Sequence, residues 1–190
     1  MGKEKYLNDV KNLFKKSPVV NIQSIQRIIR KSYAKQLIRN LAIKGKIKRL
    51  AKGCYTVHDD PSLAVFCFKP AYLGLQDGLS FHNLWEQETI PVIVTAAKVR
   101  QGIRKVLDTN ILVRRIDRKY LFGFDYCHYS NDLYLPYSDI EKTLIDMVYF
   151  RQKMTKETIQ EIKKRIDRKK LDSYLKRYPE KIRKKVIACI

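Results

Sequence analysis

Residues 32–57, SYAKQLIRNLAIKGKIKRLAKGCYTV, contain the pattern that decides the fold. The first half predicts an amphipathic helix that starts at Ser32, a good N-cap residue, and stops before Gly45, where a positive φ commonly ends a helix. Apolar residues at three- and four-residue spacing define the inward face: Ala34, Leu37, Ile38, Leu41 and Ala42. The remaining positions form a polar and basic face.

The second half of the stretch predicts a short β-hairpin. Residues 47–50 and 54–57 are strand-like, and Ala51-Lys52-Gly53 forms a three-residue loop that ends in glycine. Two earlier amphipathic helices are expected over residues 4–16 and 22–30, the second capped by Asn21. Three helices followed by a basic hairpin predict a winged helix-turn-helix domain over residues 1–60.

Such a domain presents its third helix to the major groove of DNA. Arg binds guanine O6 and N7, whereas Asn and Gln bind adenine N6 and N7. The side chains expected to read bases are Lys35, Gln36, Arg39 and Asn40. Those expected to contact the phosphate backbone are Ser32, Lys44, Lys46, Lys48, Arg49 and Lys52. The alternative is a winged helix used only for protein contacts.

The distribution of charge supports a polyanionic partner. The chain of 190 residues has a formal net charge of +21. Residues 1–60 have 15 Lys or Arg and 4 Asp or Glu, residues 61–150 have 10 of each, and residues 151–190 have 15 and 5. Two basic modules therefore flank a neutral one, which favours nucleic acid over an acidic protein or an anionic membrane surface.

The rest of the chain predicts an α+β module over residues 61–150 and a basic helical extension over 151–190. Helices are expected over 61–66, 71–84 and 140–150, the last with a capping box at Ser138 and Glu141. Strands are expected over 90–95, 111–116 and 120–129, with a short edge strand at 133–135. The Lys-rich helices after Thr155 are expected to break near Arg168 and at Pro179.

The sequence offers little support for an enzyme. Phosphate-loop, dinucleotide, nucleophile-elbow and zincin motifs are absent. A metal-dependent nuclease remains an alternative, and its candidate side chains are Asp125, Asp132, Asp139, Glu141 and Lys142. Four scattered cysteines without a CxxC pair fit a reducing cytoplasm, and neither Cys54 with His58 nor Cys127 with His128 makes a metal pattern. We expect no catalytic residue, metal or cofactor, a structural role for His82, and no membrane-spanning segment.

Several segments together resemble one protein family. Residues 72–87, YLGLQDGLSFHNLWEQ, are followed by Val92-Ile93-Val94-Thr95, by Leu121-Phe122-Gly123-Phe124 and by residues 141–146, EKTLID. With residues 44–55, KGKIKRLAKGCY, this succession is similar to the AbiEi-type antitoxins, also described as transcriptional regulators of viral defence systems. The resemblance covers about residues 20–150.

The resemblance implies a cytoplasmic DNA-binding autorepressor of a type IV toxin–antitoxin or abortive-infection operon. It implies binding to inverted repeats in a promoter by a monomer or weak dimer that is cooperative on DNA. By position it also implies a base-reading role for Tyr33, beside Lys35, Gln36, Arg39 and Asn40. It also implies a functional link between the C-terminal module and a nucleotidyltransferase-like toxin. A solitary winged-helix regulator without a toxin is the alternative. A further hypothesis makes residues 61–190 an interaction module for the toxin or its RNA target.

Overall fold

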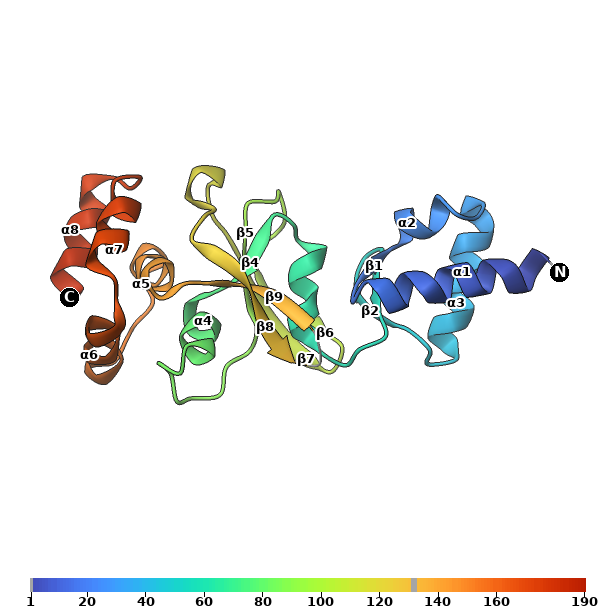
Figure 1. Ribbon diagram of the computed structural model, residues 1–190, viewed down its shortest axis with the longest axis horizontal. Coiled ribbons are helices and arrows are strands. Elements are labelled where there is room, and N and C mark those ends of the chain that lie inside the picture. The colour runs from blue at the N-terminus through green and yellow to red at the C-terminus, as the bar shows by residue number, and fades with distance from the viewer. Residues whose placement is uncertain (1, 131–132) are drawn as a thin grey trace. The chain divides into compact units, whose positions relative to one another are not determined.

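The computed structural model describes residues 2–130 and 133–190, and it divides into two compact units. Unit 1 ends at Cys67 and also contains Lys105–Asn110, whereas unit 2 consists of Phe68–Arg104 and Ile111–Ile190. Figure 1 labels the helices and strands of each unit except β3 (Cys54–Thr56). Helices and a mixed sheet are both present, which confirms the mixed α and β content that the sequence predicts.

Unit 1 has three helices and a small sheet. The helices are α1 (Gly2–Lys16), α2 (Ile22–Gln26) and α3 (Lys31–Ile43). Strands β1 (Val20–Asn21), β2 (Lys48–Ala51) and β3 (Cys54–Thr56) form an antiparallel sheet in the order β1-β3-β2. The three helices bury one apolar cluster that includes Val10, Phe14, Ile25, Ala34, Leu37, Ile38 and Leu41.

The start of α3 differs from the expectation. Its N-cap is Arg30, which makes no side-chain capping bond, and the Ala34 amide donates to the Arg30 carbonyl at 2.9 Å. Ser32 therefore lies inside the first turn, and the prediction that it caps the helix is wrong. Helix α2 ends at Gln26 rather than Arg30, and a turn follows in which Ile28 is exposed.

Unit 2 is built on a six-stranded mixed sheet in the order β6-β7-β5-β4-β9-β8. The strands are β4 (Ala71–Leu73), β5 (Val92–Thr95), β6 (Gly102–Val106), β7 (Thr109–Arg115), β8 (Phe124–Ser130) and β9 (Leu133–Ser138). Strand β5 runs parallel to β7 and antiparallel to β4, while β9 runs parallel to β4 and antiparallel to β8. The apolar run in β5 is buried throughout, as expected for a strand covered on both faces.

Three expectations for the sheet are corrected. Residues 71–73 are a buried central strand and not the start of a helix, because their backbone pairs with β5 and β9. Helix α4 (Leu75–Phe81) begins only after Gly74. Strand β9 is internal and extends to Ser138, so the edge belongs to β8. Strand β6, at the other edge, has no counterpart among the predicted strands.

Helices α4, α5 (Ile140–Tyr149), α6 (Lys156–Arg165), α7 (Arg168–Leu175) and α8 (Glu180–Cys189) supply the rest of unit 2. One continuous core joins α4 and α5 to buried residues of the last three helices, namely Ile162, Leu171, Leu175 and Val186. Breaks near Arg168 and at Pro179 are confirmed. Residues 151–190 thus pack into unit 2, and η1 (Pro61–Cys67) lies in unit 1 beyond the expected boundary at residue 60. None of the helices described is long and apolar enough to span a bilayer.

Candidate nucleic-acid interface

The end of α3 is fixed by its backbone. The Lys46 amide donates to the Leu41 carbonyl at 2.9 Å, and the Gly45 amide donates to the Ala42 carbonyl at 3.0 Å. These two bonds are the Schellman arrangement, which requires a left-handed residue after the helix. Gly45 has φ +65°, as predicted. The chain therefore leaves α3 sharply and enters the β2–β3 hairpin.

Helix α3 has one apolar and one polar face. Ala34, Leu37, Ile38 and Leu41 are at most 9% exposed and hold the helix on the core of unit 1. Ala42, which was expected among them, is exposed. Four of the side chains predicted to read bases are exposed together: Lys35, Gln36, Arg39 and Asn40. Between Asp9 and Asp59 the chain contains no Asp or Glu, so no carboxylate within that stretch neutralises this face.

The exposed face combines two amides with two cations. The Gln36 Nε2 donates to the side-chain Oδ1 of Asn40 at 3.2 Å, one helical turn away. Each amide group retains further donor and acceptor capacity, which is the chemistry that recognises an adenine edge. Arg39 can bind the O6 and N7 acceptors of guanine from the same face. The arrangement is suited to contacts with base edges.

Tyr33 lies apart from these four side chains. It is half-buried, packs against the core of unit 1, and meets the ring of Tyr6 edge-on with centroids 6.4 Å apart. Its ring therefore helps to hold α1 on α3. Its role in base reading remains a prediction.

The predicted phosphate contacts are mostly free at the surface. Ser32, Lys44, Lys46, Arg49 and Lys52 are exposed. The Arg49 Nε also donates to the Ala51 carbonyl at 3.3 Å. Lys48 differs because its ammonium pairs with the exposed Asp59 carboxylate, so a phosphate has to displace that partner.

The side chains of the nuclease alternative converge only in part: Asp139 and Glu141 both pair with the Lys170 ammonium, at 3.0 and 3.3 Å. Lys142 is fully buried and cannot contact a substrate, so its assignment to a catalytic set is wrong. The N-cap of α5 is Asp139, whose carboxylate accepts from the Lys142 amide at 2.7 Å. Glu141 does not complete a capping box, since it accepts from the Asp167 amide at 2.8 Å and pairs with Lys170 at 3.3 Å.

The other members of that set give no metal site. Asp125 lies on the edge strand β8, and Asp132 lies outside the described residues. Across residues 2–130 and 133–190, no three His, Cys, Asp or Glu side chains group closely enough to hold a metal ion.

His82 has the structural role expected of it, with Nε2 2.7 Å from the Ser138 carbonyl oxygen. The Cys54 thiol is hydrogen-bonded to Cys67, which lowers the pKa of Cys54 to about 7.

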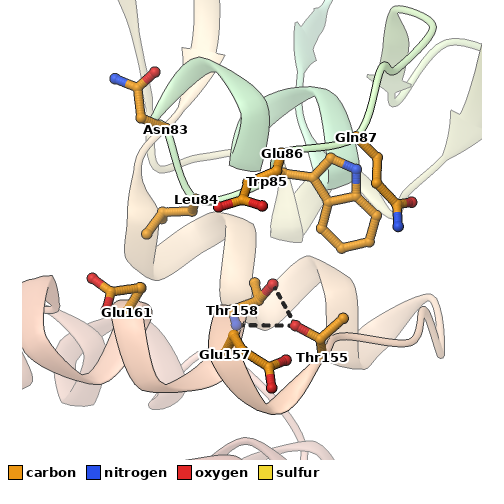
Figure 2. Close-up of a pocket in the computed structure, with 9 residues that line it drawn as sticks. All are labelled: Asn83, Leu84, Trp85, Glu86, Gln87, Thr155, Glu157, Thr158 and Glu161. Carbon is orange, nitrogen blue, oxygen red and sulfur yellow. Dashed lines mark hydrogen bonds between the residues drawn. The ribbon is translucent and has the colours of Figure 1, made fainter.

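Unit 2 contains a pocket of about 390 Å³ with acidic walls. Figure 2 shows Trp85, Glu86 and Gln87, from the loop after α4, across from the first turns of α6. Helix α6 contributes Glu157 and Glu161, and its cap is formed by the Thr155 hydroxyl, which accepts from the Thr158 amide at 3.1 Å. The backbone amide of Glu157 and the Thr155 hydroxyl hold the pKa of Glu157 below its ordinary value. Carboxylates beside an indole ring suit a cationic group and repel phosphate.

Sequence reasoning missed a buried polar network in unit 2. Lys142 and Asp146 form an ion pair one turn apart on α5, and the Tyr72 hydroxyl donates to Asp146 Oδ2 at 2.5 Å. All three side chains are fully buried. Burial raises the pKa of Asp146 and lowers that of Lys142, in each case against the influence of the partner charge. The four-residue spacing of two opposite charges in a mostly apolar helix is the signal that could have revealed the pair.

Comparison with known proteins identifies a similar fold. No family model matches the chain, and no curated protein matches it. The crystal structure of the RV2827C protein from Mycobacterium tuberculosis superposes with a TM-score of 0.61 at 13% sequence identity. The match covers 97% of this chain and 76% of that one. At such low identity the likeness establishes the fold alone.

Proposed function

We propose that this protein is a sequence-specific DNA-binding transcriptional repressor and that unit 1 acts as a winged helix-turn-helix. The observation that carries the proposal is the outward face of α3, where Lys35, Gln36, Arg39 and Asn40 are exposed together. The basic β2–β3 hairpin follows directly along the chain and supplies further cations. Amide and guanidinium groups read base edges, and the lysines neutralise phosphates.

The most direct test is an equilibrium binding titration with two DNA duplexes. One is the segment upstream of the protein's own reading frame, and the other is a scrambled duplex of equal length and composition. A specific repressor binds its own site about 10³-fold or more tightly than unrelated DNA at physiological salt. Equal affinity for both duplexes would leave only non-specific electrostatic binding and would refute the proposal.

The role as an autorepressor and antitoxin rests on the resemblance to the AbiEi-type family. Under that reading the protein binds inverted repeats in its own promoter and counters a nucleotidyltransferase-like toxin. A solitary regulator has the same DNA-binding face and no toxin. Coexpression with an adjacent nucleotidyltransferase-like gene product distinguishes them, because only the antitoxin restores growth.

The acidic pocket of Figure 2 favours a second candidate function, in which unit 2 binds a partner protein. Glu161 is paired with Lys164 at 2.6 Å, which leaves Glu86 and Glu157 beside the indole ring. A basic side chain of a toxin fits these two carboxylates and the indole better than an RNA phosphate does. The test uses full-length Glu86→Lys, with Asp172→Lys, on the exposed surface of α7, as the charge-matched control. Loss of growth rescue by Glu86→Lys alone supports a toxin contact at the pocket, and equal rescue by both variants contradicts it.

A further inference from the structure

Unit 1 contains an apolar groove of about 710 Å³ between α1 and α3. Its floor consists of side chains from both helices, including Val10, Phe14, Leu37 and Leu41. Val57, just after β3, also lines the groove and is 43% exposed. An exposed apolar side chain next to a preformed apolar floor is a favourable place for another apolar group.

The rim of the groove is basic. Lys11 and Lys15 of α1 lie along it, together with Lys44 and Lys46 at the end of α3. Among the described residues that line the groove there is no Asp or Glu. An apolar floor between two rows of cations is complementary to an amphipathic helix whose polar flanks carry carboxylates.

We propose that this groove binds an amphipathic helix of an acidic partner protein. The apolar face of the partner helix, with side chains at three- and four-residue spacing, contacts the surface left exposed by Leu7, Phe14, Leu41 and Val57. Its carboxylates contact the lysines of the rim. A second copy of this chain is a poor occupant, because a protein of net charge +21 is repelled by the same lysines. DNA is a poor occupant because phosphates gain nothing from an apolar floor.

The groove also shares residues with the proposed DNA-binding surface. Asn40, Lys44 and Lys46 line the groove and belong to the side chains expected to contact DNA. A helix seated in the groove therefore occupies groups that the duplex needs, so the partner releases the repressor from DNA. This second step rests on the proposed function, whereas binding to the groove does not.

The first experiment contains no DNA. The probe is a fluorescein-labelled synthetic peptide of 18 residues, with Leu at helical i, i+3, i+4 and i+7 spacing and Glu at most other positions. Fluorescence polarisation with the full-length protein is expected to show saturable binding. A scrambled peptide of the same composition is expected to bind at least tenfold more weakly, because its apolar residues no longer share one face. Equal binding of both peptides would overturn the proposal.

Two variants on α1 locate the contact. Lys15→Glu reverses a charge on the groove, and Lys16→Glu makes the same change at the next residue, outside the lining. Lys15→Glu is expected to weaken peptide binding roughly threefold to tenfold, since an exposed attraction becomes a repulsion. Lys16→Glu is expected to leave it unchanged. Equal losses in both variants would show attraction to net charge and would overturn the site.

A competition arm separates this inference from the proposed function. Adding the upstream duplex is expected to displace the labelled peptide. If the duplex binds and the peptide does not, the groove proposal fails and the repressor stands. If the peptide binds in the groove and no duplex is specific, the repressor fails and the groove site stands. Simultaneous binding of both ligands would overturn the release step.

Discussion

The buried ion pair on α5 gives the sharpest prediction about stability. Lys142 and Asp146 have no exposed surface, and the Lys142 ammonium lies 5.3–5.9 Å from the ring centroids of Tyr72, Phe122 and Tyr178. In Asp146→Asn the ammonium loses its counter-charge and remains enclosed. Removing one partner of a buried pair costs about 3–5 kcal/mol. At about 2–4 °C for each kcal/mol in a chain of this size, the melting temperature falls by roughly 6–20 °C.

The assay follows unit 2 alone. Trp85 is the only tryptophan in the chain and packs against the core that contains the pair, so its fluorescence in a urea titration reports that unit. The control is the double variant Lys142→Met, Asp146→Asn, which removes both charges and retains an acceptor for the Tyr72 hydroxyl. The double variant is expected to be more stable than Asp146→Asn by about 2 kcal/mol or more. A loss below about 1 kcal/mol in Asp146→Asn, or additive losses in the double variant, would refute the reasoning.

Three further predictions concern a hydroxyl, two glycines and salt. The Tyr178 hydroxyl is buried without a hydrogen-bond partner, so Tyr178→Phe should raise the free energy of unfolding by about 1 kcal/mol in a urea titration at pH 7. Burial also raises the pKa of Tyr178 above its value in the unfolded chain, which is about 10. The free energy of unfolding is therefore unaffected by this group below about pH 10 and falls as the pH rises above it. The advantage of the variant should therefore widen above that pH, and a constant difference would contradict the assignment. Gly123 and Gly45 have similar positive φ values, +70° and +65°, so alanine is strained by the backbone to a similar degree at both positions. Thermal circular dichroism should nevertheless show a larger loss of stability in Gly123→Ala than in Gly45→Ala. A Cβ at Gly123 meets Lys142 and Tyr174 at 2.9 Å, whereas one at Gly45 meets nothing within 4 Å; equal losses would exclude the clash. If roughly six to ten phosphates are contacted, affinity for DNA should fall about 10³–10⁵-fold between about 50 and 200 mM salt in a binding titration, and a flat response would exclude phosphate contacts.

The local features of unit 1 could be predicted because local chemistry determines them. Helical spacing placed Leu37, Ile38 and Leu41 on the core, and the need for a positive φ placed the end of α3 at Gly45. The start of α3 was harder to predict, because serine suits both the N-cap position and the first turn of a helix, so the residue type of Ser32 does not distinguish the two. The half-buried position of Tyr33 depends on α1 docking against it, which no local pattern in α3 encodes.

The errors in unit 2 arise from pairings distant in sequence. Residues 71–73 look helical in isolation, and only their pairing with β5 and β9 makes them a central strand. The same applies to β9, whose neighbour β4 lies about sixty residues away. The burial of Lys142 is also tertiary in origin, because the C-terminal helices that were expected as a separate extension enclose α5. The exposed base-reading candidates were easier to predict because α3 is covered on one face only.

The measurement that tests the central claim most directly is the affinity of Arg39→Ala for the protein's own upstream duplex and for scrambled DNA. Arg39 is exposed on α3 beside Gln36 and Asn40. If it reads a base, the variant loses about 1–3 kcal/mol on the upstream duplex and much less on the scrambled one. Equal losses on both duplexes would make Arg39 a phosphate contact. No loss on either would contradict the assignment of α3 as the DNA-reading helix.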